Sequence, residues 1–166
     1  MTEGVVHVPD LNLGELDVAC DSWPDGGSIP VEHTADGAGR PPVVRWTGVP
    51  AGAVELVLVM HDPDAPLVDG FTHWAVHGID PNVGSIGEGN DASTAGGVVE
   101  DLNELGETGY AGPDPPPGHG VHHYFLHLYA LDRPIGGDAP LSPAELHERM
   151  VGHVLEQARW TGTYGR

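Results

Sequence analysis

Two acidic residues and a histidine follow closely on an apolar run. The segment Asp62-Pro63-Asp64-Ala65-Pro66 follows the mainly apolar residues 54–60, with His61 between them, and His73 and Trp74 come a few residues later. Proline fixes its own φ and restricts the residue before it, so this loop can hold its carboxylates in place. A carboxylate near an imidazole can fix the tautomer of that imidazole or accept a hydrogen bond from an ammonium group. A plain proline-rich turn with solvated acids remains an alternative, because Asp-Pro pairs are common in turns.

The same order of a rigid loop and a histidine-led strand occurs again further along the chain. The segment Gly109-Tyr110-Ala111-Gly112-Pro113-Asp114-Pro115-Pro116-Pro117-Gly118 precedes the apolar residues 121–131. Strand alternation places His122 and Tyr124 on one face and His123 on the other. We therefore expect His122 and Tyr124 to point together into one pocket. Imidazole N–H and phenol O–H groups can both donate to phosphoryl oxygens.

These two segments resemble the phosphatidylethanolamine-binding protein family, in the prokaryotic branch often called Raf kinase inhibitor-like. The matching motifs are D-P-D-A-P, an H-W strand start, G-Y-x-G-P-x-P-P, and H-x-Y at the head of a strand that ends L-Y-A-L-D. Weaker matches lie at 40–50 and 162–166, so the resemblance covers roughly residues 28–166. It implies a mainly β fold: an antiparallel Greek-key β-sandwich with a large sheet on a smaller one and a C-terminal helix.

The resemblance also implies a binding site. In the family, the counterparts of Asp62, His73, His122 and Tyr124 line an anion-binding pocket between the two Gly/Pro loops. The chain is then a binding protein for a small anionic, phosphate-bearing ligand, with no cofactor, and it inhibits kinases or peptidases through protein contacts. The family usually carries arginine at the His123 position, so this chain lacks a fixed cation that would strengthen anion binding. The residues expected to bind the ligand are Asp62, Asp64, Ala65, Pro66, His73, Gly112, Pro113, Pro116, His122 and Tyr124.

Two other kinds of site remain as alternatives. A small hydrolase or lyase could use His73, His122 and Asp62 as acid–base groups. None of the serines lies in a G-x-S-x-G setting, however, which weighs against a nucleophilic enzyme. The histidines of segment 119–127 raise the alternative of a metal site. Because His122 and His123 face opposite sides and no cysteine is near, we predict no metal site. Because no nucleophile is found, we predict no catalytic residue.

Composition limits the classes of partner. The chain of 166 residues is expected to form one domain, with 25 acidic residues against six arginines, no lysine and a formal charge of −19. Such a charge argues against nucleic acid or an anionic membrane surface as partner, since both need a basic footprint. The excess of acid indicates a salt-rich cytoplasm; a high-GC genome that replaces lysine by arginine is the alternative.

Location and assembly are indicated less directly. No apolar stretch approaches the roughly 18 residues of a membrane span, and no signal peptide is visible at the N-terminus. Cys20 is the only cysteine, which fits a reducing cytoplasm, and we expect it to be a small buried side chain. Prokaryotic members of the resembled family often pair, which leaves a homodimer open.

The elements that must position the site follow from turn signals and periodicity. Glycine and proline separate short apolar runs, which predicts strands at 43–47, 54–61, 73–79 and 121–131 and a long acidic loop over 80–120. Ser142-Pro143-Ala144-Glu145 is a capping box, and apolar residues at i+4 spacing from Leu146 to Ala158 predict a helix over 143–160. The Ala65-Pro66 bond, at a pocket wall, is predicted to be cis.

Overall fold

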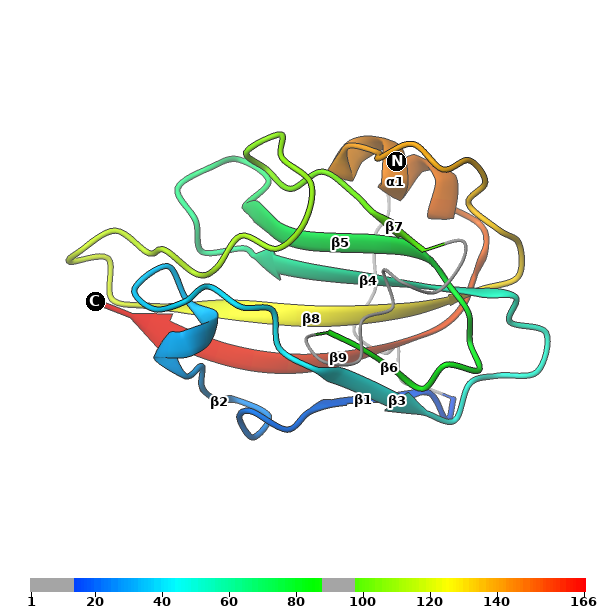
Figure 1. Ribbon diagram of the computed structural model, residues 1–166, viewed down its shortest axis with the longest axis horizontal. Helices are drawn as coiled ribbons and strands as arrows, with labels where there is room; N and C mark the ends of the chain where they lie inside the picture. The colour runs from blue at the N-terminus through cyan, green and yellow to red at the C-terminus, as the bar shows by residue number, and fades with distance from the viewer. Residues whose placement is uncertain (1–13, 88–97) are drawn as a thin grey trace.

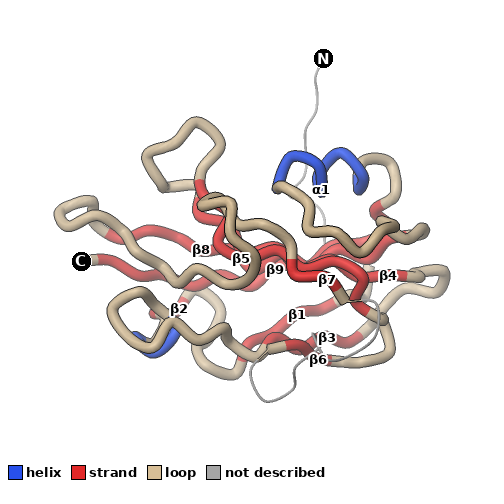
Figure 2. The backbone as a smooth tube through the Cα atoms, turned by 45° about the horizontal axis from the view of Figure 1, so that its top comes forward, coloured by secondary structure: helices blue, strands red, loops and turns tan. Residues whose placement is uncertain are grey.

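Two β-sheets pack face to face in the computed structural model, which describes residues 14–87 and 98–166 (Figures 1 and 2). The smaller sheet has the order β1-β3-β6, with β1 Asp17–Cys20, β3 Val44–Thr47 and β6 Ser85–Ile86. The larger sheet has the order β2-β9-β8-β4-β5-β7, with β2 Gly27–Ser28, β9 Val154–Gly165, β8 Val121–Leu131, β4 Glu55–Asp62, β5 Phe71–Ile79 and β7 Val99–Glu100. A 3₁₀ turn spans Val31–His33, and helix α1 spans Pro143–Met150. The predicted mainly β sandwich is confirmed.

The main core lies between the two sheets. Alternate residues of the large sheet, such as Leu58 and Leu126, meet Val18 and Trp46 of the small sheet. A second apolar cluster lies on the other face of the large sheet, where α1 covers Val57. Both faces of β4 are therefore buried along much of its length, which explains why its sequence is continuously apolar rather than alternating.

The predicted strands agree with the structure to within two residues. Strand β8 has the predicted bounds, whereas β5 begins at Phe71, so His73 is its third residue rather than its first. The segment 80–120 is not one continuous loop, because it contains β6 and β7; its residues 88–97 lie outside the described part. Cys20 is buried in the main core, as predicted.

The predicted helix over 143–160 is too long. The capping box at Ser142 forms as predicted, but α1 ends at Met150, and Gly152 follows with φ of 83°. The residues after it form β9, which pairs antiparallel with the whole of β8. Without β9, one row of backbone groups on β8 would lack partners, and that non-local demand outweighs a helical pattern of only a few residues. Val154 is accordingly exposed rather than part of a helical apolar stripe.

The predicted cis bond before Pro66 is also wrong, because every peptide bond in the described ranges is trans. The loop turns by other means. The N–H of Leu67 donates to the carbonyl of Ala65 at 2.7 Å, and Gly70 takes a φ of 70° just before β5. A trans bond is the ordinary preference for X–Pro, and this turn does not require the other isomer.

Candidate functional site

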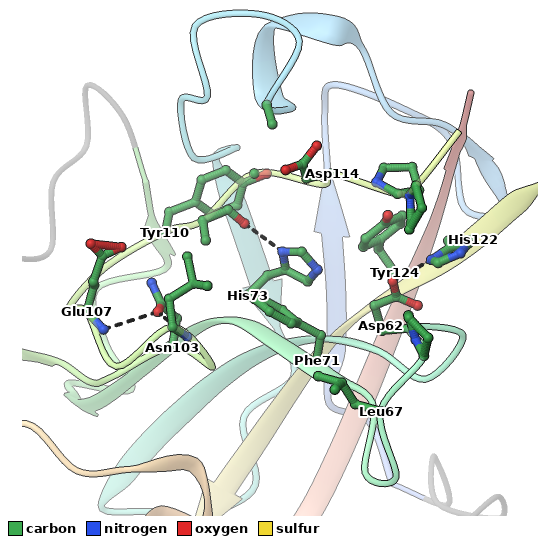
Figure 3. A pocket seen from close by; sticks show the side chains of 18 of the residues that line it. Asp62, Leu67, Phe71, His73, Asn103, Glu107, Tyr110, Asp114, His122 and Tyr124 are labelled. Atoms are coloured by element: carbon green, nitrogen blue, oxygen red, sulfur yellow. Dashed lines mark hydrogen bonds and ion pairs between the residues drawn. The ribbon is translucent and has the colours of Figure 1, made fainter. Parts of the chain in front are cut away.

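A pocket of about 690 Å³ opens at one end of the large sheet, where strand β4 ends and strands β5 and β8 begin (Figure 3). Asp62 is the last residue of β4, while Phe71 and His73 come from the start of β5 and His122 and Tyr124 from the start of β8. Because β4 is antiparallel to both neighbours, its C-terminal end lies beside their N-terminal ends. The sheet topology thus gathers side chains from distant parts of the sequence.

A β-bulge aims His73 into this pocket. The pairing of β4 with β5 steps from Met60–Trp74 to His61–Thr72, which leaves His73 without an opposite residue. His73 lines the pocket and the adjacent Trp74 lies in the main core, so two consecutive residues face the same side of the sheet. Bulges re-aim side chains in this way and are frequent near functional sites.

Asp62 and His122 form a buried pair at the polar end of the pocket. The Nδ1 of His122 lies 2.7 Å from Oδ2 of Asp62, and their side chains are only 3% and 4% exposed. The other carboxylate oxygen accepts from the N–H of Asp64 at 2.8 Å. Since Nδ1–H donates to the carboxylate, Nε2 is the only ring nitrogen of His122 left for another partner.

His73 offers an acceptor rather than the expected donor. Its Nδ1 lies 2.7 Å from the carbonyl oxygen of Ala111, and a carbonyl can only accept, so Nδ1 carries the hydrogen. Burial lowers the pKa of His73, against a smaller opposing effect of that hydrogen bond. The imidazole is therefore neutral near pH 7, with a lone pair on Nε2.

Tyr124 provides the strongest unused donor. Its hydroxyl is buried and has no hydrogen-bond partner among the described residues. Burial, with a contribution from the Asp62 carboxylate, raises the pKa of Tyr124 far above its usual value. The phenol thus stays protonated and can donate to a ligand.

Most residues expected at the site line the pocket, but two do not. Those lining it are Asp62, Ala65, Pro66, His73, Gly112, Pro116, His122 and Tyr124. Asp64 instead accepts from the backbone N–H and the Nδ1–H of His123, both at 2.8 Å, and these hydrogen bonds lower the pKa of Asp64. The carbonyl of Pro113 accepts from the N–H of Ala35 at 2.9 Å. Both residues therefore hold the pocket's walls together from outside.

The glycine of the second loop has a packing role. A Cβ on Gly112 would lie 2.8 Å from the carbonyl carbon of Thr34 and 3.0 Å from the nitrogen of Ala35. The absence of a side chain thus allows the second Gly/Pro loop to approach the 33–35 backbone closely.

One wall of the pocket is not predicted by the sequence motifs. It is formed by Asn103, Leu105, Glu107, Thr108, Tyr110 and Ala111, and only the last two belong to a recognised motif. The side chain of Asn103 shapes this segment: its Oδ1 accepts from the N–H groups of Leu105 at 2.9 Å and Glu107 at 3.2 Å, and its Nδ2 donates to Gly109. An asparagine that bonds to the backbone two residues on is a common turn signal, but it does not indicate that the turn borders a pocket.

The pocket carries more acid than base. Asp62, Glu107 and Asp114 line it, and none of the described lining residues is lysine or arginine. Arg166 pairs with Asp114 at 2.7 Å and also with Asp36. Among the described lining residues, positive charge can therefore come only from protonated histidine. In residues 14–87 and 98–166, no three His, Cys, Asp or Glu side chains are grouped so that they could hold a metal ion.

Comparison with known proteins defines the class. The family model described as phosphatidylethanolamine-binding protein matches residues 20–165. A relative from Methanothermobacter thermautotrophicus, named only as a UPF0098 protein, is 41% identical over 146 residues, which cover 86% of this chain and 93% of the relative. The chain therefore belongs to the phosphatidylethanolamine-binding protein family.

Solved structures agree with this assignment. A protein from Chlamydia trachomatis, described as a homologue of phosphatidylethanolamine-binding protein, superposes with a TM-score of 0.82 at 32% identity, over 92% of this chain and 99% of that one. Escherichia coli YbcL, described as a member of the mammalian family, gives a TM-score of 0.84 at 27% identity over the same shares. Within the described ranges, no helix has the length and apolar character needed to cross a bilayer.

Proposed function

We propose that the protein binds a small phosphate-bearing anion at the polar end of this pocket. The observation that carries the proposal is the buried Tyr124 hydroxyl, which has no partner in the described chain and whose ring stacks on that of His122 at 6.4 Å between centroids. A buried, unpartnered hydroxyl costs about 1–3 kcal/mol, and an accepting phosphoryl oxygen would remove that cost. His122, oriented by Asp62, adds a second donor when it is protonated.

Charge decides how such a ligand is held. A phosphate placed beside Asp62 and near Asp114 needs compensating positive charge, and protonation of His122 supplies it. His73, kept neutral by burial, contributes a lone pair that accepts from a ligand hydroxyl or ammonium group. Anion affinity is therefore expected to be higher at pH 5.5 than at pH 8, because acid favours the protonated imidazole.

Calorimetry with inorganic phosphate and O-phosphorylethanolamine at pH 5.5 and pH 8 tests the proposal. Binding should be tighter at the lower pH, and His122→Ala should weaken it by about tenfold or more. His123→Ala is the matched control, because that side chain is 52% exposed and does not line the pocket. Equal losses in the two variants would contradict the assignment of donors, and no loss in either would place the binding site elsewhere.

Exposed apolar side chains beside the pocket support a second role, inhibition of a kinase or peptidase through protein contacts. Leu67 and Leu105, which line the pocket, are 53% and 62% exposed, and Val68 is fully exposed. Grouped exposed apolar side chains commonly mark contact surfaces. Inhibition of a test kinase or serine peptidase that disappears in Leu67→Ser and Leu105→Ser would support this role; inhibition unchanged in both would exclude this surface.

A small hydrolase or lyase is the alternative function. The Asp62–His122 pair has the geometry of an oriented acid–base group. Against it, Thr108 carries the only aliphatic hydroxyl among the described lining residues, and none of those residues is cysteine. Turnover of any member of a panel of phosphorylated metabolites, lost in His122→Ala, would favour the enzyme over the binding protein.

We propose a cytoplasmic location. Whether the protein is a monomer or a homodimer is a separate question for measurement. The buried, unpaired Cys20 is compatible with a reducing compartment. A Mycobacterium tuberculosis relative, 40% identical over 154 residues, is provisionally named lipoprotein LppC, which makes cell fractionation the direct test. Light scattering on the purified protein distinguishes a monomer from the homodimer that the family suggests.

A further inference from the structure

A second histidine lies against the ligand-facing nitrogen of His122. The Nδ1 of His119 is 3.3 Å from the Nε2 of His122, and the ring centroids are 5.5 Å apart. Two lone pairs would repel at that distance, so one of the two nitrogens carries a hydrogen. Because Asp62 occupies the other nitrogen of His122, His119 contacts the only one through which His122 can reach a ligand.

His119 lies in an exposed turn between two glycines. His119 is exposed and lies in the turn that joins Pro116 to β8, where its N–H donates to the carbonyl of Pro116 at 3.2 Å. Gly118 and Gly120, on either side, have φ of 83° and 82°, and a Cβ on either would meet no atom within 4 Å apart from its own chain neighbours. His119 itself does not line the pocket, so it meets His122 from the solvent side.

Building on the proposed function, we infer that His119 is a second ligand-binding imidazole and that the ligand is a phosphate monoester rather than a diester. A monoester dianion has three terminal oxygens. The donors that can reach them are also three: the Tyr124 hydroxyl and one N–H each from His119 and His122. A diester has only two terminal oxygens and one charge, so it presents one acceptor atom fewer and less negative charge to these donors.

The surrounding charges require that both imidazoles be protonated for a dianion. Asp64 is already paired with His123, and Asp114 with Arg166, so neither pair offers free charge to the ligand. One protonated imidazole offsets Asp62, and only a second offsets part of the ligand charge. The charged and titratable groups that face the His119–His122 pair or its neighbour Tyr124 are Asp62, Asp64, His73, Asp114, Tyr164 and Arg166.

Calorimetry with methyl phosphate and dimethyl phosphate at pH 7.5, in two buffers of different ionisation heat, tests the inference. The wild type should bind methyl phosphate more tightly and take up more protons with it than with dimethyl phosphate. His119→Ala should lower the methyl phosphate affinity about tenfold and remove close to one proton of uptake. Its dimethyl phosphate affinity should change by less than about twofold, as should both affinities in the control His123→Ala.

The outcomes separate this inference from the proposed function. If His119→Ala leaves the proton uptake and the preference for monoester unchanged, His119 is not a ligand residue, and phosphate binding that still depends on His122 leaves the proposed function standing. If the wild type binds neither ester, the proposed function fails and the inference fails with it.

Discussion

The Nδ1 of His122 and the Oδ2 of Asp62 lie 2.7 Å apart, although 60 residues separate them in the chain. Both side chains are buried, so separating them would leave each without a partner away from water, which is costly. The sheet brings the two together, and that cost keeps them paired. Because Nδ1 of His122 is held by Asp62, Nε2 is the ring nitrogen that points away from Asp62. Asp62 therefore acts on a ligand through His122.

Asp62→Asn should weaken phosphate binding at pH 6.5 by about tenfold or more. The asparagine oxygen can still accept from Nδ1–H, but it carries no charge to favour the protonated imidazole. Asp64→Asn is the matched control, since Asp64 pairs with His123 and does not line the pocket. Calorimetry on both variants checks this expectation, and a loss of the same size in each would show that the Asp62–His122 pair has no special part in binding.

Tyr124→Phe should weaken phosphate binding without lowering the stability of the fold. Removing a buried hydroxyl without a partner should leave the free energy of unfolding unchanged or raise it by about 1 kcal/mol. Phosphate affinity should fall about tenfold, because one donor is lost. Urea denaturation and calorimetry on the same preparation measure the two effects; a variant that is less stable but binds normally would mean that the hydroxyl serves the core.

Asp101→Asn should destabilise the fold strongly. The carboxylate of Asp101 lies 2.8 Å from Nδ1 of His77 and accepts from the N–H of Leu141, with both charged side chains almost fully buried. Breaking such a pair costs about 3–5 kcal/mol. The exposed pair of His153 and Asp132, at 3.1 Å, provides the control, and Asp132→Asn should cost less than about 1 kcal/mol. Similar costs in urea denaturation would contradict this contrast.

The same pair gives stability a pH dependence. Burial acts to lower the pKa of His77, but the hydrogen bond and charge of Asp101 outweigh it and the pKa is raised. The folded protein thus holds this proton more tightly than the unfolded chain does. The contribution is complete below about pH 6.5 and is lost as pH rises through the raised pKa. The difference in unfolding free energy between wild type and Asp101→Asn should accordingly be larger at pH 6 than at pH 9.

Added salt should raise the melting temperature. A formal charge of −19 on 166 residues makes the folded surface repel itself, and screening weakens that repulsion until it saturates. The exposed arginine pairs, such as Arg45 with Asp21, are worth too little to reverse the trend when they are screened. Thermal melts between low and molar KCl check this; a flat or falling melting temperature would remove the argument for a salt-adapted protein.

The sequence by itself determined what depends on neighbours along the chain. Alternation in 121–131 placed His122 and Tyr124 on the buried face and His123 on the exposed one, and the structure has that arrangement. The capping box fixed the start of α1. The apolar runs and their Gly/Pro boundaries indicated the sandwich. These features follow from backbone geometry over a few residues, which a single sequence displays directly.

Only the tertiary structure decided what depends on pairing between distant segments. The bulge that turns His73 into the pocket exists because β4 and β5 pair with a register step. The conversion of 154–160 from expected helix to strand follows from the open edge of β8. Asp64 turns to His123 because β8 begins beside it. Each of these three features depends on hydrogen bonds between segments that are far apart in the chain. A short-range sequence pattern does not indicate which segments will pair.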